Sequence, residues 1–232
     1  MPTLYAIATP LGGAPEHSLP APALAQVRAL RDFVAENAKS ARAFLAAAGA
    51  RPREAAIVEL NEHSDLSRAA DLLRPLREGR DLGLLSEAGC PAIADPGAAL
   101  VEAAHREGFR VAPLVGPCAL LLGLMASGLE GQRFAFCGYL PREPRERRER
   151  IRALEARSRK EHETEIFIET PYRNEALLSA LLEACAPGTR LCVAADLTLA
   201  TETVKTRTIA QWRRAGEAIG RRPAVFLLLA QQ

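Results

Sequence analysis

Four turns built from small residues, each following an apolar strand-like run, are the stretches of this sequence best suited to chemistry. They cover residues 9–12, 87–97, 116–119 and 169–173. Glycine permits unusual backbone angles and proline fixes φ, so each turn has a specified shape. In an alternating α/β chain, ligands bind beyond the carboxyl ends of the strands, where these turns should lie. The turns predict a ligand site lined by backbone amides and carbonyls. The alternative is a set of ordinary tight strand–helix connections.

The motifs of several enzyme classes are absent from the sequence. It contains no GxxxxGK[ST], no GxGxxG after its first strand, no HExxH and no GxSxG. The histidines are scattered without the spacing of metal ligands. Backbone-lined turns suit a ligand whose own chemistry is already activated. S-adenosylmethionine is one, because its sulfonium makes the methyl group electrophilic and the protein mainly has to align the acceptor.

The amino-acid composition limits the class of protein and the cellular compartment that can be expected. With 232 residues, 48% hydrophobic and 25% charged, the chain is typical of a globular protein of one large or two modest domains. An odd number of cysteines without a CxxC pair argues for a reducing compartment and against disulfides or structural zinc. No stretch has the features of a signal peptide or of a membrane span. We therefore expect a cytoplasmic protein that needs no metal.

The elements that must position the turns alternate along the first half of the chain. Strands are expected at residues 4–8, 33–35, 56–60, 82–85 and 110–115, with helices at residues 24–30, 40–48, 66–77 and 98–106. This βαβα rhythm is typical of a mostly parallel sheet with helices on both faces.

The second half of the chain has a different pattern of expected strands and helices. Strands are expected at residues 134–139, 164–169, 191–195, 201–208 and 224–229, with helices ending near residue 125 and covering residues 174–185. Residues 201–208 alternate polar and β-branched side chains, as in a half-exposed antiparallel strand. We expect two α/β domains, residues 1–116 with a mostly parallel sheet and residues 117–232 with a mixed sheet.

An arginine-rich run, PREPRERRERIRALEARSRK at residues 141–160, permits two interpretations. Clustered arginines could bind RNA phosphates. Glu143 and Arg147, like Glu146 and Arg150, lie four residues apart, which is the spacing of a self-paired, solvated helix. The run itself contains no aromatic residue for base stacking. We favour the solvated helix, with RNA contact as a secondary role.

Several stretches together resemble the tetrapyrrole methylase superfamily of S-adenosylmethionine-dependent methyltransferases. They run in family order over nearly the whole chain: LYAIATPLGG, AEN, NEH, LLSEAGCPAIADPG, VAPLVGPCALLLGLMASGL, FCGYLPRE and IFIETPYRN. The most similar branch methylates the ribose 2′-hydroxyl of a cytidine in small-subunit ribosomal RNA. The resemblance implies the two-domain tetrapyrrole methylase fold, S-adenosylmethionine in the cleft between the domains, and a homodimer.

Position by position, the resemblance also implies the residues that contact the cofactor. They are Pro10, Leu11, Cys90, Ile93, Cys118, Ala119, Thr170 and Ala195. For Ala119 and Ala195, plain core packing is an equal alternative.

Methylation of a ribose hydroxyl benefits from a group that accepts its proton. Glu62, His63 and Glu87 are the candidates, because they lie at the ends of expected strands. Lys39 and Arg173 could hold a phosphate or orient the acceptor. The alternatives are a capping or surface pair for Glu62 and His63, and a carboxylate that accepts loop amides for Glu87.

The sequence also departs from the pattern of that branch. AENAKSAR stands where the branch has AEDTR, so that Asn37 replaces an acid and Lys39 an arginine. Lysine cannot reproduce the planar, bidentate grip of arginine. EAGCP and TPYR stand for DAGTP and SPHR. RNA methylation is the favoured function; methylation of a small molecule such as a corrin precursor, or cofactor binding without transfer, remain alternatives.

Overall fold

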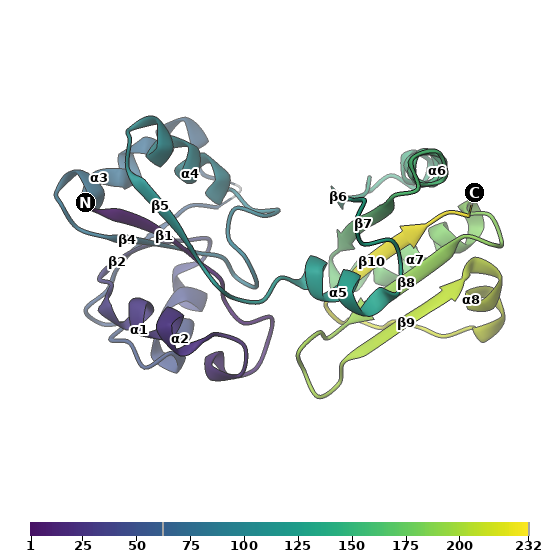
Figure 1. Cartoon of the computed structure of the whole chain (residues 1–232), viewed down its shortest axis with the longest axis horizontal. Helices are drawn as coiled ribbons and strands as arrows, with labels where there is room; N and C mark the ends of the chain where they lie inside the picture. Colours follow the sequence, from purple (N-terminus) through teal and green to yellow (C-terminus); the bar gives the residue numbers. More distant parts are fainter. Residues whose placement is uncertain (62, 232) are drawn as a thin grey trace. The chain divides into compact units, whose positions relative to one another are not determined.

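The computed structural model describes residues 1–61 and 63–231, with the backbone alone for residues 66–68. The chain divides into two compact units, Met1–Cys118 and Ala119–Gln232, whereas the sequence predicted a boundary after Gly116. Each unit is built on a five-stranded sheet (Figure 1). The predicted two-domain α/β class is confirmed, with a parallel sheet in unit 1 and a mixed sheet in unit 2.

The sheet of unit 1 has the strand order β3-β2-β4-β1-β5, and all neighbouring strands are parallel. Its strands are β1 (Thr3–Ile7), β2 (Asp32–Ala35), β3 (Ala56–Glu59), β4 (Leu82–Leu85) and β5 (Arg110–Leu114). The sequence LGLL of β4 is buried throughout, as expected for a strand covered on both faces. Because all strands run the same way, their carboxyl ends meet at one edge of the sheet.

Helices cover both faces of this sheet (Figure 1). One face packs against α1 (Ala21–Ala29) and α2 (Ala38–Ala47), and the other against α4 (Gly97–Arg106) and a 3-10 segment, η2 (Leu66–Leu73). The expected single helix over residues 66–77 is wrong, because η2 gives way to a separate short helix, α3 (Arg74–Arg77). Pro75 lies in the first turn of α3, where its missing amide hydrogen is tolerated.

The sheet of unit 2 has the strand order β6-β7-β10-β8-β9. Its strands are β6 (Phe134–Tyr139), β7 (Thr164–Glu169), β8 (Arg190–Ala195), β9 (Thr203–Thr208) and β10 (Ala224–Leu229). Only the pair β6–β7 is parallel among the described pairings, and β9 is antiparallel to β8 as the sequence predicted. The central strand β10 is buried along its whole length.

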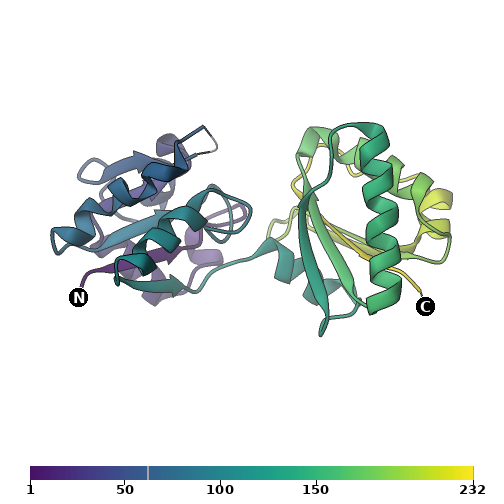
Figure 2. The same ribbon diagram turned by 90° about the horizontal axis from the view of Figure 1, so that it is seen from above.

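One face of this sheet is covered by α6 (Pro144–Glu161), α7 (Asn174–Ala184) and α8 (Ile209–Ala215). Figure 2 shows α6 as the long helix lying across that face. The other face packs against α5 (Ala119–Ser127). Within residues 1–61 and 63–231, no helix has both the length and the apolar character needed to span a bilayer.

Gly83 on β4 tests the packing between this strand and its neighbours. A Cβ at this position would lie 2.7 Å from Phe33 Cδ1 and 3.0 Å from Ile7 Cδ1. We therefore expect Gly83→Ala to lower the free energy of unfolding by about 1–3 kcal/mol, measured by urea denaturation. Gly131→Ala is the control, since nothing lies within 4 Å of the added Cβ. Equal stability of the two variants would contradict this packing.

Candidate active site

Three loops of unit 1 come together at the carboxyl ends of the neighbouring strands β4, β1 and β5. Thr9 and Gly89 exchange two backbone hydrogen bonds, of 2.9 and 3.0 Å, which tie the loop after β1 to the loop after β4. The Ser86 hydroxyl donates to the carbonyl of Gly89 at 2.6 Å. The Cys90 thiol lies 3.5 Å from the carbonyl oxygen of Pro117, in the loop after β5. The loops are thus fixed to one another by backbone groups.

Gly89 lies where two of these loops approach most closely. Its φ of +79° is strained for other residues, and a Cβ here would lie 3.2 Å from Leu11 Cδ2 and 3.6 Å from the Pro117 oxygen. The glycine therefore allows the backbones of the three loops to lie side by side and to present their polar groups at one edge.

The middle of the loop after β4 is strained and holds an exposed apolar side chain. Ala92 and Ala94 both have a φ of +64°. The Asp95 carboxylate accepts the N–H groups of Ala92 and Gly97, each at 2.8 Å. Burial raises the pKa of Asp95, although the two N–H donors oppose that rise. Ile93, between the strained alanines, is 45% exposed. Strain of this kind is concentrated at ligand sites, so this loop is a strong candidate for one.

The two cysteines of these loops are free thiols. Burial, together with the neighbouring Cys118 thiol, raises the pKa of Cys90 to about 11. Cys90 is therefore protonated at neutral pH and lines the site without acting as a nucleophile. The loops that the structure brings together carry five residues expected to contact a cofactor, namely Pro10, Leu11, Cys90, Ile93 and Cys118.

Cys90 is expected to react with iodoacetamide more slowly than free cysteine at about pH 8, because only the thiolate reacts. Its rate should rise steeply as the pH approaches about 11, the value to which burial raises its pKa. Peptide mass spectrometry after timed labelling measures this rate. Labelling at pH 8 as fast as that of free cysteine would contradict the described environment.

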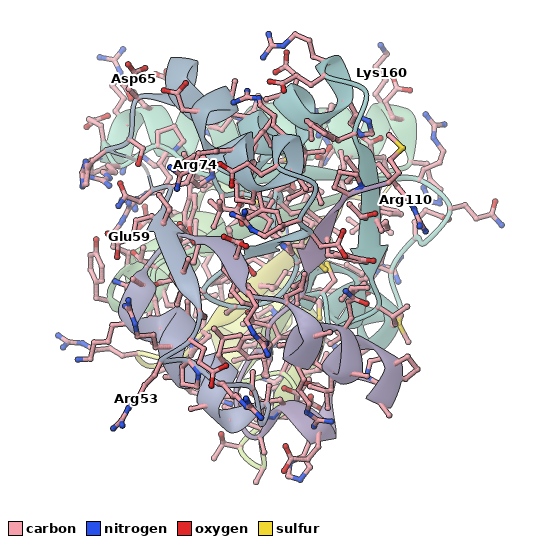
Figure 3. The ribbon with its side chains drawn as sticks, turned by 90° about the vertical axis from the view of Figure 1, so that its left-hand side faces the viewer. Arg53, Glu59, Asp65, Arg74, Arg110 and Lys160 are labelled. Carbon is pink, nitrogen blue, oxygen red and sulfur yellow. The ribbon has the colours of Figure 1, made fainter. Side chains whose placement is uncertain are left out.

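The first turn of α2 lies at the same edge of the sheet, after β2. The Asn37 side chain accepts the N–H groups of Lys39 and Ser40, at 2.9 and 3.0 Å, and so caps the helix. Glu59 accepts the N–H of Ala38 at 2.7 Å. Figure 3 labels Glu59 at the end of β3. An asparagine and an acid cap helices equally well, so the replacement at Asn37 preserves this local structure.

Asn37→Ala removes this cap and should lower the free energy of unfolding by about 1 kcal/mol, whereas Asn37→Asp should change it little. Urea denaturation followed by far-UV circular dichroism measures both variants. If the alanine variant were as stable as the aspartate variant, the cap would contribute nothing.

Glu87 faces the same turn of α2, and its carboxylate accepts the Ser40 hydroxyl at 3.3 Å. A pocket of about 260 Å³ adjoins it, with a lining drawn from the loop after β1 and from α2. The exposed Glu87 is thus the candidate proton acceptor that the structure places next to the first loop. The alternative role for Glu87 was a carboxylate that accepts loop N–H groups. No such hydrogen bond to Glu87 is found among the described residues.

The other two predicted proton acceptors follow β3. Glu62 lies outside the described residues. His63 is exposed, and its N–H donates to Asn61 Oδ1 at 3.1 Å. In the sheet, β2 lies between β3, which precedes His63, and β4, which precedes Glu87. Lys39 is exposed on the first turn of α2, close in sequence to the Ser40 that contacts Glu87.

In unit 2, Thr170 and Ala195 lie at the same edge of the sheet, since Glu169 and Ala195 are both in register with Ala224 of β10. Ala195 is 1% exposed and packs in the core under α6 and α7, so a ligand contact there would have to use its backbone. Ala119 begins α5 and packs on the opposite face of the sheet.

Arg173 forms an ion pair with the buried carboxylate of Glu169. Its Nη2 lies 2.9 Å from Glu169 Oε2, and its side chain is only 16% exposed. Glu169 also accepts the N–H and the hydroxyl of Thr170, at 2.8 and 3.2 Å. Glu169, Thr170 and Arg173 of the ETPYR turn are therefore held by one another.

The expected ion pairs in the arginine-rich run are wrong, although the helix itself is present as α6. Neither Glu143–Arg147 nor Glu146–Arg150 forms a pair among the described residues. Arg147 instead lies on the buried face of the helix with Ile151. The pairs at this spacing in α6 are Arg145–Glu149, at 3.2 Å, and Glu155–Arg159, at 3.8 Å.

Thr9 and Asp95 lie within two of the predicted ligand-site turns, but neither of them, nor Ser86, was predicted to fix the loops. Asp95 precedes a proline and a glycine, and that turn-forming pattern was the available signal. No group of three or more His, Cys, Asp or Glu side chains in the described part of the chain is arranged to hold a metal ion.

Comparison with known proteins defines the class. The family described as Tetrapyrrole (Corrin/Porphyrin) Methylases matches residues 4–212. The chain belongs to this family. Relatives named ribosomal RNA small subunit methyltransferase I include one from Escherichia coli O157:H7, 32% identical over 225 residues that cover 93% of this chain and 76% of that protein. The relative from Xylella fastidiosa is 36% identical over 208 residues, covering 90% and 73%.

Solved structures share the fold at lower sequence identity. The methyltransferase CobJ aligns with a TM-score of 0.66 and 20% identity, covering 99% of this chain and 95% of that one. Diphthine synthase aligns with a TM-score of 0.64 and 17% identity, covering 99% and 90%. A uroporphyrin-III C-methyl transferase from Thermus thermophilus, complexed with S-adenyl homocysteine, aligns at 0.60 and 18%, covering 99% and 97%.

Proposed function

We propose that this methyltransferase transfers the methyl group of S-adenosylmethionine to a ribose 2′-hydroxyl of a cytidine in small-subunit ribosomal RNA. The observation that carries the proposal is the similarity of nine-tenths of the chain to relatives named ribosomal RNA small subunit methyltransferase I. A ribosomal RNA substrate would place the protein in the cytoplasm.

The loops of unit 1 fit this cofactor. Leu11 and the exposed Ile93 offer apolar contacts, and backbone hydrogen bonds between Thr9 and Gly89 join the loops that carry them. When bound, S-adenosylmethionine supplies an electrophilic methyl group, so these loops have to bind and orient without a nucleophile. The protonated Cys90 agrees with that requirement. We extend the cofactor contacts to Ala119, Thr170 and the backbone of Ala195.

On the acceptor side, Glu87 is the proposed group that accepts the proton of the ribose hydroxyl, with Glu62 and His63 as the other candidates. The exposed Lys39 would hold a phosphate of the RNA. Arg173, held by Glu169, would orient the acceptor.

We also propose that two copies of the chain form a dimer. On α5, Leu121 and Met125 lie one turn apart and are 48% and 80% exposed. Apolar side chains exposed in this way mark surfaces that a partner covers. A second copy would bury them.

Transfer of labelled methyl groups tests the proposed substrate. S-adenosylmethionine would be supplied in parallel to undermethylated small ribosomal subunits, naked ribosomal RNA and a small-molecule extract. Label in RNA that maps to a cytidine ribose is the expected result. Label only in the extract would assign small-molecule methylation, and cofactor binding without any transfer would assign a binding role.

Cys118→Trp tests the position of the cofactor. The added indole should fill the edge where the three loops meet, and we expect at least about tenfold weaker binding of S-adenosylmethionine by calorimetry. Cys118→Ala should bind as the wild type does. A folded Cys118→Trp variant with unchanged affinity would reject this position.

A further inference from the structure

One edge of the unit 2 sheet holds four polar side chains that each have a buried atom without a hydrogen bond. Among the described residues, six buried side-chain nitrogen or oxygen atoms make no hydrogen bond. Four of the six belong to Arg147, Glu169, Arg173 and Asn174. Glu169 Oε2 and Arg173 Nη2 form an ion pair with each other, which leaves Arg147 Nε and Asn174 Oδ1 without a partner among the described residues. All four residues lie where the parallel strands β6 and β7 end and where α6 and α7 begin. Natural proteins contain few such atoms, so Arg147 Nε and Asn174 Oδ1 at one edge point to a partner that the described residues do not supply.

Arg147 is the unsatisfied cation of this group. The residue is 6% exposed, its Nε makes no hydrogen bond, and it has no ion pair among the described residues. Arg173 and Glu169 compensate each other's charge, at 2.9 Å. A buried charge without a partner is costly, so an anion at Arg147 would be stabilising. The amino-terminal ends of α6 and α7 add positive potential at the same edge.

The charges along α6 differ between its two halves. In the second half, Arg157, Arg159 and Lys160 are paired with glutamates. The first half of α6 and the residue range just before it differ from this. Five arginines there form no ion pair within the described part of the chain: Arg142, Arg147, Arg148, Arg150 and Arg152. Of the acids there, Glu143 caps the helix and Glu149 pairs with Arg145, while Glu146 adds one more negative charge. The uncompensated positive charge therefore lies toward the carboxyl ends of β6 and β7.

Two exposed tyrosines lie at this same edge. Tyr139 ends β6 and is 55% exposed, and Tyr172 follows β7 and is 67% exposed. Tyr139 is aligned with Ile168, near the end of β7, so the two aromatic side chains belong to adjacent strand ends. The arginine-rich run contains no aromatic residue, but the fold supplies two beside it. Exposed aromatic rings next to arginines are the surface on which unpaired bases stack.

We propose that Tyr139, Tyr172 and Arg147 form a docking surface for single-stranded RNA. Bases stack on the two tyrosines, and a backbone phosphate binds at Arg147. Single-stranded RNA is the occupant because base faces are available only where bases are unstacked, and a duplex hides them. This inference rests on the proposed function, since it assumes that RNA is the substrate.

Anisotropy of a fluorescein-labelled single-stranded RNA oligonucleotide tests the surface without requiring methyl transfer. Tyr139→Ala and Tyr172→Ala should each weaken binding about tenfold. Phe134→Ala is the matched control, since Phe134 is 43% exposed at the opposite end of β6. Affinity for S-adenosylmethionine should be unchanged in all three variants. Wild-type affinity in both tyrosine variants, an equal loss in the control, or no RNA binding by the wild type would overturn the proposal.

Arg147→Gln tests the phosphate contact. Each phosphate neutralised on a single strand adds about 0.7 to the slope of log affinity against log salt concentration, so this variant should lose about 0.7. Arg110→Gln, an exposed arginine at the amino end of β5 in unit 1 (Figure 3), should keep the wild-type slope. An unchanged slope in a folded Arg147→Gln variant would remove Arg147 from the surface.

The two proposals fail in different ways. If the wild type methylates no RNA, the proposed function is wrong, whatever the anisotropy shows. If it methylates RNA while the tyrosine variants bind the oligonucleotide normally, the function stands and the docking surface is wrong.

Discussion

The pair of backbone hydrogen bonds between Thr9 and Gly89 is the constraint on which the site of unit 1 depends. The parallel sheet brings the carboxyl ends of β4, β1 and β5 to one edge, but it does not fix the shape of the loops that follow. The two hydrogen bonds do so, and the lack of a side chain at Gly89 lets Leu11 and Pro117 approach. Asp95 then holds the strained segment that presents Ile93.

A site made this way suits methyl transfer from an activated donor. In the proposed function, the loops bind the cofactor through backbone groups and apolar contacts, and none of their side chains has to become a nucleophile. Burial keeps Cys90 protonated, which agrees with this division of roles. In the proposed function, the groups that distinguish one acceptor from another lie on α2, at Glu87 and at the strand ends of unit 2.

Most of the fold could be predicted from the sequence, because apolar periodicity and turn residues mark every strand of both sheets. The departures have local causes. Pro75 divides the helix expected over residues 66–77, and α8 went unpredicted although Thr208 and Gln211 form a capping box. The five unit 1 positions implied by the family resemblance do lie on loops that meet. Features that depend on packing between distant segments could not be predicted from the sequence. They are the burial of Arg147, the Glu169–Arg173 ion pair and the exposure of Tyr139 and Tyr172.

Hydrogen–deuterium exchange with and without S-adenosylhomocysteine tests whether the backbone amides of the three unit 1 loops hold the cofactor. We expect slower exchange in the three loops at residues 9–13, 86–97 and 115–118 when the ligand is bound, with the far ends of β1, β4 and β5 unchanged. Ligand binding that leaves these loops unprotected, or that protects only amides elsewhere in the chain, would contradict this expectation.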